Sequence, residues 1–247
     1  MSVYVPRGPG VNALDGNTSP PRGGLPLPGT AVRSLGAVPD RRIALSLSFY
    51  GVLAAGALTW GILRGNVDLY HYPSPWWGLT FPASTGLALF AGVFVALLVI
   101  WSTRVLVRRV SWARELHGEF RGLLGRLTGP EIAVFALTSG IAEEMFFRGA
   151  MQPAVGLTLS GLAFGLVHIG PRRAFLPWTI WAILMGWVFG VLYAVTGELL
   201  APVVAHCLIN YENLHFIDAY DPRRESGDEA PKSTDPPRLV GKPVRGD

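Results

Sequence analysis

Six polar side chains lie within apolar stretches of this sequence, and together they could carry out hydrolytic chemistry. Glu143 and Glu144 stand side by side in the stretch from Ile132 to Met151, which is long enough to cross a bilayer, and Arg148 follows. An ionisable side chain at bilayer depth costs about 2.5–3.5 kcal/mol on insertion scales, so such residues indicate a functional site. Two further apolar stretches carry the rest of the set: His168, His206 and Asn210.

Two carboxylates and two imidazoles can bind or polarise one water molecule. In one version His168, His206 and Glu143 hold a divalent metal such as zinc, similar to the His₂Glu set of catalytic zinc sites, while the other glutamate takes a proton as water attacks a carbonyl. In a metal-free version Glu143 is the general base, and the histidines with Asn210 stabilise the oxyanion. No HExxH motif is present, so a metal site would be assembled across helices.

Arg148 lies one helical turn after Glu144 and should stabilise the ionised form of that carboxylate. The two glutamates are then expected to divide into one fixed anion and one tunable base. Alternatively, Glu144 and Arg148 only neutralise each other within one helix, which leaves Glu143 without a partner. Either histidine taken alone could be a packing residue that hydrogen-bonds a neighbouring helix.

The composition is that of a membrane protein. Half of the 247 residues are apolar and only 15% are charged, whereas soluble domains carry about 25% charged residues. The single cysteine, Cys207, excludes an internal disulfide framework. The net charge of +4 comes mainly from arginines beside apolar segments, which favours membrane orientation and indicates no nucleic-acid partner. The lipid bilayer is therefore the expected partner.

The predicted fold is all-α, a polytopic bundle of about six transmembrane helices. At 1.5 Å per residue most segments reach the ~30 Å of hydrocarbon, and the fourth is short at about 22 Å. The predicted helices are Ile43–Leu63, Thr85–Thr103, Glu131–Met151, Ala154–His168, Ala174–Thr196 and Glu198–Ile217.

Disordered tails are expected on both sides of this bundle. Residues 1–40 form a leader rich in proline and glycine, and residues 219–247 are similar with mixed charges. The transmembrane domain should therefore span residues 41–218, with the catalytic core at 131–217.

Arginines predict the orientation in the cell membrane. They precede the first helix and fill the second and fourth loops, which puts both termini and the even loops in the cytoplasm. In the second loop, apolar residues recur every three or four positions from Leu106 to Leu123. This pattern predicts a basic amphipathic helix on the cytoplasmic leaflet, or alternatively an extension of the second membrane helix.

Counting residues from the outer ends of the helices predicts that the polar side chains meet. Glu143 and Glu144 lie about 12 Å below their outer end, His168 about 21 Å, and His206 and Asn210 about 12 and 18 Å. Three helices thus deliver polar groups to one layer of the membrane. Elsewhere, two GxxxG patterns, Gly161 to Gly165 and Gly186 to Gly190, predict close approach of helices.

Three short motifs resemble those of one protein family. Glu143-Glu144-Met-Phe-Phe-Arg148 matches an EExxxR motif, Phe164-Gly-Leu-Val-His168 an FxxxH motif, and His206-Cys-Leu-Ile-Asn210 an HxxxN motif. In this order on successive membrane helices, they resemble the CAAX-processing and bacteriocin-immunity (CPBP, or Abi) intramembrane proteases, which include type II CAAX prenyl endopeptidases. The resemblance covers roughly a third of the chain, from Glu131 to Ile217.

The resemblance implies a helical membrane endopeptidase acting on a peptide or protein substrate, which in eukaryotic relatives is the C-terminus of a prenylated protein. It implies that Glu143 activates the water while Glu144 and Arg148 shape the site. His168 and His206 would bind the metal or the water. Asn210 would support the oxyanion.

Two alternatives from other classes use the same polar centre. A proton-coupled transporter would employ Glu143, Glu144 and His168 as a relay. The absence of an internal repeat speaks against it, because many transporter folds contain one. A non-catalytic membrane scaffold or immunity protein would keep the motifs for structure alone.

Overall fold

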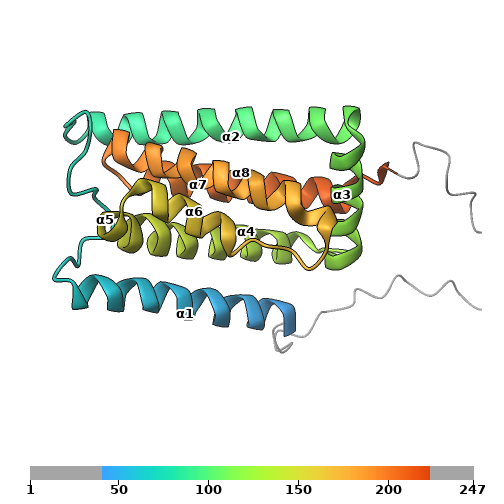
Figure 1. Ribbon diagram of the computed structural model, residues 1–247, viewed down its shortest axis with the longest axis horizontal. Helices are drawn as coiled ribbons and strands as arrows, with labels where there is room; N and C mark the ends of the chain where they lie inside the picture. The colour runs from blue at the N-terminus through green and yellow to red at the C-terminus, as the bar shows by residue number, and fades with distance from the viewer. Residues whose placement is uncertain (1–40, 223–247) are drawn as a thin grey trace, which may run out of the picture. The chain divides into compact units, whose positions relative to one another are not determined.

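The computed structural model describes residues 41–222, and these form the predicted all-α bundle (Figure 1). Within this range there is no strand, only one isolated bridge between His71 and Glu198. The predicted leader, 1–40, and residues 223–247 of the predicted tail lie outside the described residues. Their disorder stays a prediction.

A helix occupies each of the six predicted places. These are α1 (Arg41–Leu63), α2 (Ala83–Arg109), α4 (Gly129–Glu144), α6 (Leu157–Leu166), α7 (Leu176–Thr196) and α8 (Leu200–Ala219). Shorter elements join them: α3 (Ser111–Leu124), the π-helix η1 (Met145–Met151), α5 (Gln152–Val155) and the 3₁₀ helix η2 (Arg173–Phe175). By length and composition, α1, α2 and the segment Arg173–Thr196 are able to cross a membrane, whereas α6 is apolar but shorter. Crossing by the remaining segments stays a prediction.

The third predicted helix changes its winding in the middle. The α-helical part ends at Glu144, and η1 continues with the wider π turn, so that the N–H of Gln152 bonds to the carbonyl of Phe147, five residues earlier. The hydroxyl of Ser160 also donates to this carbonyl, at 2.6 Å. Such π segments often occur at functional sites. Here the segment begins directly after the glutamate pair.

The second loop contains a separate helix, and α2 also extends beyond its predicted end at Thr103. Val110 has extended backbone angles, φ −118° and ψ 129°, and this break separates α2 from α3. In Figure 1, α3 runs across one end of the bundle, at a steep angle to α2. The prediction of an amphipathic helix in this loop is confirmed, but part of its apolar side lines an internal cavity described below.

The helices differ greatly in how deeply they are packed. α8 packs against α2, α4 and α7, and α6 packs mainly against α7. In contrast α1 lies at one edge of the bundle against α4 and η1, and only Ala57 and Gly61 of this helix are buried (Figure 1). Most of the surface of α1 therefore remains available to lipid.

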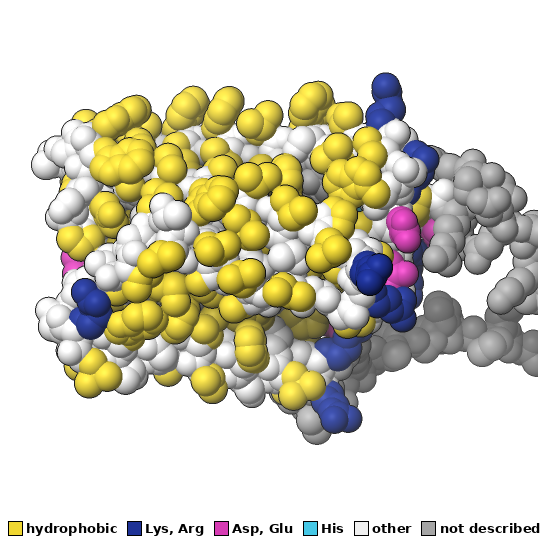
Figure 2. Space-filling view, in the orientation of Figure 1, with side chains coloured by type: hydrophobic (Ala, Val, Ile, Leu, Met, Phe, Trp, Pro, Cys, Tyr) yellow, Lys and Arg dark blue, Asp and Glu magenta, His cyan; other side chains and the backbone are white. Residues whose placement is uncertain are grey.

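Apolar side chains cover most of the visible face of the bundle, while most of the arginine side chains in view gather at the end where α3 lies (Figure 2). This distribution is typical of a membrane protein with a cytoplasmic basic end, as the positive-inside rule describes. The assignment of this end to the cytoplasm remains the prediction made from the arginines.

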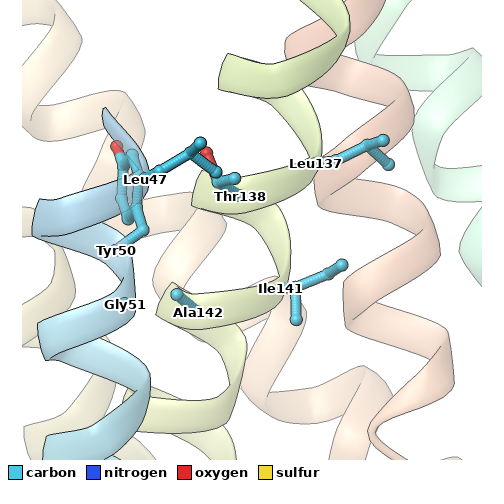
Figure 3. A pocket seen from close by; sticks show the side chains of 7 residues that line it. All are labelled: Leu47, Tyr50, Gly51, Leu137, Thr138, Ile141 and Ala142. Atoms are coloured by element: carbon cyan, nitrogen blue, oxygen red, sulfur yellow. The ribbon is translucent and has the colours of Figure 1, made fainter. Parts of the chain in front are cut away.

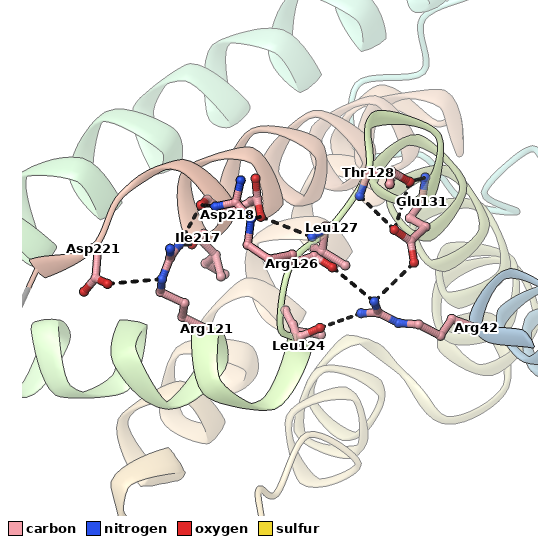
Figure 4. Close-up of polar contacts among 10 residues, drawn as sticks. All are labelled: Arg42, Arg121, Leu124, Arg126, Leu127, Thr128, Glu131, Ile217, Asp218 and Asp221. Atoms are coloured by element: carbon pink, nitrogen blue, oxygen red, sulfur yellow. Dashed lines mark hydrogen bonds and ion pairs between the residues drawn. The ribbon is translucent and has the colours of Figure 1, made fainter. Parts of the chain in front are cut away.

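At the basic end, polar contacts tie the start of α1 and the end of α8 to the loop before α4 (Figure 4). The Arg42 guanidinium pairs with the buried Glu131 carboxylate at 3.2 Å. Glu131 also closes a capping box with Thr128, whose backbone N–H donates to it at 2.7 Å. Arg121 of α3 donates to the backbone carbonyl of Ile217 at 2.6 Å. These contacts fix the helix ends around the mouth of the cavity.

Candidate active site

Four segments of the bundle bring the predicted polar residues together. α4 ends in the two glutamates, η1 carries the arginine, the turn after α6 carries His168, and α8 carries His206 and Asn210. Glu144 and Arg148 have no exposed surface, while Glu143 and His206 are also buried. The convergence that residue counting predicted is therefore observed in the structure.

Glu144 is held by two cationic or donor groups. Arg148 Nη1 lies 3.0 Å from Glu144 Oε1, and the Nδ1 of His206 lies 2.7 Å from the same oxygen. Arg148 Nη2 donates to the carbonyl of Gly186 on α7, at 3.0 Å. With these contacts and no exposure to solvent, the Glu144 carboxylate is held in one position, and its contact with Nδ1 orients the His206 ring.

Aromatic rings enclose the arginine and one of the histidines. The Arg148 guanidinium lies over the Phe164 ring at 4.3 Å from the centroid and over the Phe189 ring at 5.4 Å. Phe189 also stacks against the His206 ring, with centroids 5.2 Å apart. Cation–π contacts of this kind strengthen when water is excluded. The rings thus fix the ion pair behind the site and shield it from water.

Glu143 and His168 face each other across a small gap. His168 Nε2 lies 3.6 Å from Glu143 Oε2, which has no hydrogen-bond partner among the described residues. His168 Nδ1 lies 2.6 Å from the carbonyl of Phe164. Because a carbonyl only accepts, Nδ1 carries the proton, and in the neutral ring Nε2 presents a lone pair. Two acceptors therefore face the same gap, and a water molecule can donate one proton to each.

Asn210 is oriented by a serine that the sequence analysis did not single out. The Ser139 hydroxyl donates to the carbonyl of Phe135 at 2.7 Å, so its oxygen is free to accept from Asn210 Nδ2, at 2.9 Å. An amide group has two N–H bonds, and the second can donate to a bound molecule. Ser139 precedes Glu143 by four residues on α4, and this one-turn spacing was the only signal for it in the sequence.

A cavity of about 590 Å³ connects these side chains with the basic end of the bundle. Glu143, His168, His206 and Asn210 all line it, whereas Glu144 and Arg148 lie behind its wall. Most of the lining is apolar, and α3 contributes Trp112, Leu116 and Phe120. The arrangement therefore has polar groups at one place in an otherwise apolar chamber, which is typical of a small-molecule or peptide site.

The donor groups partly suit a metal ion. Both histidines direct Nδ1 towards an oxygen and leave Nε2 for another partner, as metal-binding histidines do. However, residues 41–222 contain no group of three His, Cys, Asp or Glu side chains arranged to hold a metal ion. The metal set of His168, His206 and Glu143 therefore stays a prediction, and the mechanism below uses no step through a metal.

Gly161, Gly165 and Gly186 of the two GxxxG patterns bring α6 and α7 into contact, as the sequence predicted. A Cβ atom on Gly186 would collide with the backbone of Gly161, and one on Gly165 would lie 2.6 Å from the backbone nitrogen of Ile183. This close approach also brings the Gly186 carbonyl within reach of Arg148. The glycines thus contribute to the site through the backbone.

Comparison with known proteins agrees with this geometry. Residues 126–211 match the sequence model of the Rce1-like family, described as "Type II CAAX prenyl endopeptidase Rce1-like". The uncharacterized protein YpbD of Bacillus subtilis (strain 168) is 27% identical over 144 residues, which cover 57% of this chain and 75% of YpbD. No solved structure gives a significant match. The matched range contains all six polar residues, so the segment that carries the candidate site is similar to the Rce1-like family.

Proposed function

We propose that this chain is an intramembrane endopeptidase in which a water molecule between Glu143 and His168 attacks a peptide carbonyl. The observation that carries the proposal is the buried Oε2 of Glu143, which has no hydrogen-bond partner among the described residues and lies 3.6 Å from Nε2 of His168, while both side chains line the cavity. A buried carboxylate oxygen without a partner is costly in a folded protein. A bound water that donates to it removes this cost and is at the same time positioned as a nucleophile.

In this mechanism the Glu143 carboxylate takes a proton from the water as its oxygen bonds to the carbonyl carbon. The carbonyl oxygen becomes an oxyanion, which accepts from the second N–H of Asn210 and from His206 Nε2–H. With Nδ1–H donated to Glu144, the bond from Nε2–H belongs to the form of His206 in which both ring nitrogens carry protons. Glu143 then passes its proton to the leaving amine as the C–N bond breaks, which gives a carboxylic acid and an amine.

The cavity also supports a substrate class. Its lining is largely apolar and it reaches from the site to the basic end of the bundle. We therefore propose a peptide or protein segment that carries apolar groups and is associated with the membrane. A prenylated C-terminus, the substrate named in the family description, fits this chemistry.

The test is a profile of new peptide termini in membranes that contain the wild-type protein or the Glu143→Gln variant at matched expression. Glu143→Gln keeps the shape of the side chain but cannot accept the proton. Glu115→Gln serves as the matched control, because Glu115 is exposed on α3 and does not line the cavity. We expect termini that appear with the wild type and with Glu115→Gln and are lost with Glu143→Gln.

Equal sets of termini in all three samples, with candidate prenylated substrates supplied in the same membranes, would contradict the peptidase function. A pH-gradient-dependent flux in proteoliposomes, lost in Glu143→Gln, would then favour the transporter. A stable protein with neither peptidase activity nor flux would favour the non-catalytic membrane scaffold.

A further inference from the structure

Tyr50 of α1 reaches the candidate site although it lies outside the segment that matches the family. α1 is the least buried of the long helices, and its large apolar side chains are mostly exposed. Tyr50 is half-buried and lines the same cavity as Glu143 and His168. A polar side chain of a peripheral helix is thus directed inward at the site.

Tyr50 lines the cavity together with Ser139 and Glu143, which lie one turn apart on α4, and it also lies beside Thr138 and Ala142 of that helix, so its phenol faces the part of α4 that carries both side chains. An ionised carboxylate can only accept hydrogen bonds, so towards Glu143 the phenol must be the donor. Ser139 in turn receives Asn210, at 2.9 Å. Tyr50 therefore lies beside the two residues that would act on the substrate carbonyl. It faces the carboxylate of Glu143 directly, and it is connected to Asn210 through Ser139.

The ring of Tyr50 has a second environment, which fixes its position. It also lines a hollow of about 260 Å³ between α1 and α4, together with residues such as Leu47, Thr138 and Ala142 (Figure 3). One turn earlier on α1, the Ser46 hydroxyl hydrogen-bonds that of Thr138, at 3.1 Å. This contact sets the register of α1 on α4, so the ring stands between the outer hollow and the inner cavity.

We propose that Tyr50 is a positioning residue of the peptidase, whose hydroxyl holds the Glu143 carboxylate so that Oε2 faces His168. Oε2 of Glu143 is buried without a partner among the described residues, and a hydroxyl that donates to the carboxylate from the α1 side would leave that atom directed towards His168 Nε2, 3.6 Å away. This inference rests on the proposed peptidase function. It gives α1 a part in the reaction, in addition to its contact with lipid.

The test compares Tyr50→Phe with the wild type on a peptide substrate identified by the terminus profile, using the full-length purified protein. Phenylalanine keeps the ring that separates the two hollows and removes only the hydroxyl. We expect kcat to fall by about tenfold to a hundredfold, the usual effect of losing a group that orients a catalytic residue. KM should stay near its wild-type value, because the ring that faces a substrate is retained.

Tyr211→Phe is the matched control. Tyr211 lies on α8, packs edge-on against His215 and does not line the cavity, so loss of its hydroxyl should leave both constants unchanged. Wild-type kcat in Tyr50→Phe, or a loss confined to KM, would overturn the role of Tyr50 while the peptidase function stands. A wild-type protein that cleaves no peptide would overturn both proposals.

Discussion

Replacing Arg148 by methionine should strongly destabilise the bundle, because the substitution removes the main partner of a buried carboxylate. Methionine has a similar length and suits an apolar environment, so little volume is lost. Glu144 would keep only the Nδ1 of His206, at 2.7 Å. Its other oxygen, Oε2, already lacks a partner among the described residues.

The magnitude follows from the burial of the pair. Both side chains have no exposed surface, and their closest atoms are 3.0 Å apart. Removing one partner of such a pair typically costs about 3–5 kcal/mol, because an uncompensated charge remains buried. In a domain of this size, 1 kcal/mol shifts Tm by about 2–4 °C, so Arg148→Met should lower Tm by about 6–20 °C.

The assay is thermal unfolding of the purified protein in detergent, with Arg172→Met as the control. Arg172 pairs with Glu119 at the shorter distance of 2.7 Å, but its side chain is 70% exposed. An exposed pair contributes only about 0–1 kcal/mol, so this variant should change Tm by a few degrees at most. The burial of the ion pair, and not the distance between its atoms, should thus decide which of the two arginine variants loses stability.

A double variant distinguishes loss of charge balance from loss of packing. Combining Glu144→Gln with Arg148→Met removes both charges, and the Gln side-chain oxygen still accepts from His206. We expect the double variant to recover much of the lost Tm, since replacing both members of a buried ion pair is often close to neutral. A Tm of Arg148→Met within about 2 °C of the wild type, or no recovery in the double variant, would refute this reasoning.

Two further predictions concern the contact between α6 and α7 and the buried histidine of α3. Gly186→Ala should destabilise the protein by about 1–3 kcal/mol because its methyl group collides with the backbone of Gly161, whereas Gly51→Ala, with open space around it, should not; thermal unfolding in detergent compares them. Burial lowers the pKa of His117 below the ordinary 6.5, although its hydrogen bond to the Tyr220 carbonyl opposes this. The unfolded chain therefore binds a proton first, so Tm should fall as the pH drops below about 6.5, and His117→Gln should show less of this fall.

Most of the site could be predicted because the cost of polar groups in apolar segments is a strong signal. Glu143 and His168 are conspicuous in the sequence for that reason. Counting residues along their helices was enough to place them at overlapping depths in the membrane. The pairing of Glu144 with Arg148 was also predicted from spacing alone, whereas the division of the two glutamates into a fixed anion and a base stays a prediction. The i, i+4 relation between Glu144 and Arg148 is observed as a direct ion pair, at 3.0 Å.

The residues that were missed have side chains that carry no such cost. Ser139 and Tyr50 occur commonly in apolar helices, because a hydroxyl can bond to the backbone or lie against a ring. Their importance depends on which helix lies beside which. That information resides in the packing of α1 and α8 on α4, which one sequence does not reveal.

The π-helix and the position of α3 could not be predicted for a related reason. Within Met145–Met151 the apolar pattern is compatible with an ordinary α-helix, and the wider turn depends on neighbours such as Ser160. The apolar stripe of α3 was correctly read as one face of a helix. Which surface it covers, a leaflet or a cavity, depends on the turn at Val110.

The size of the cavity has a consequence for the order of events in each catalytic cycle. A chamber of about 590 Å³ holds about twenty water molecules when empty, at about 30 Å³ each, and a substrate that fills it displaces nearly all of them. In the proposed peptidase, the reactive water must therefore be bound between Glu143 and His168 before the substrate enters, and it is replaced only after a product has left.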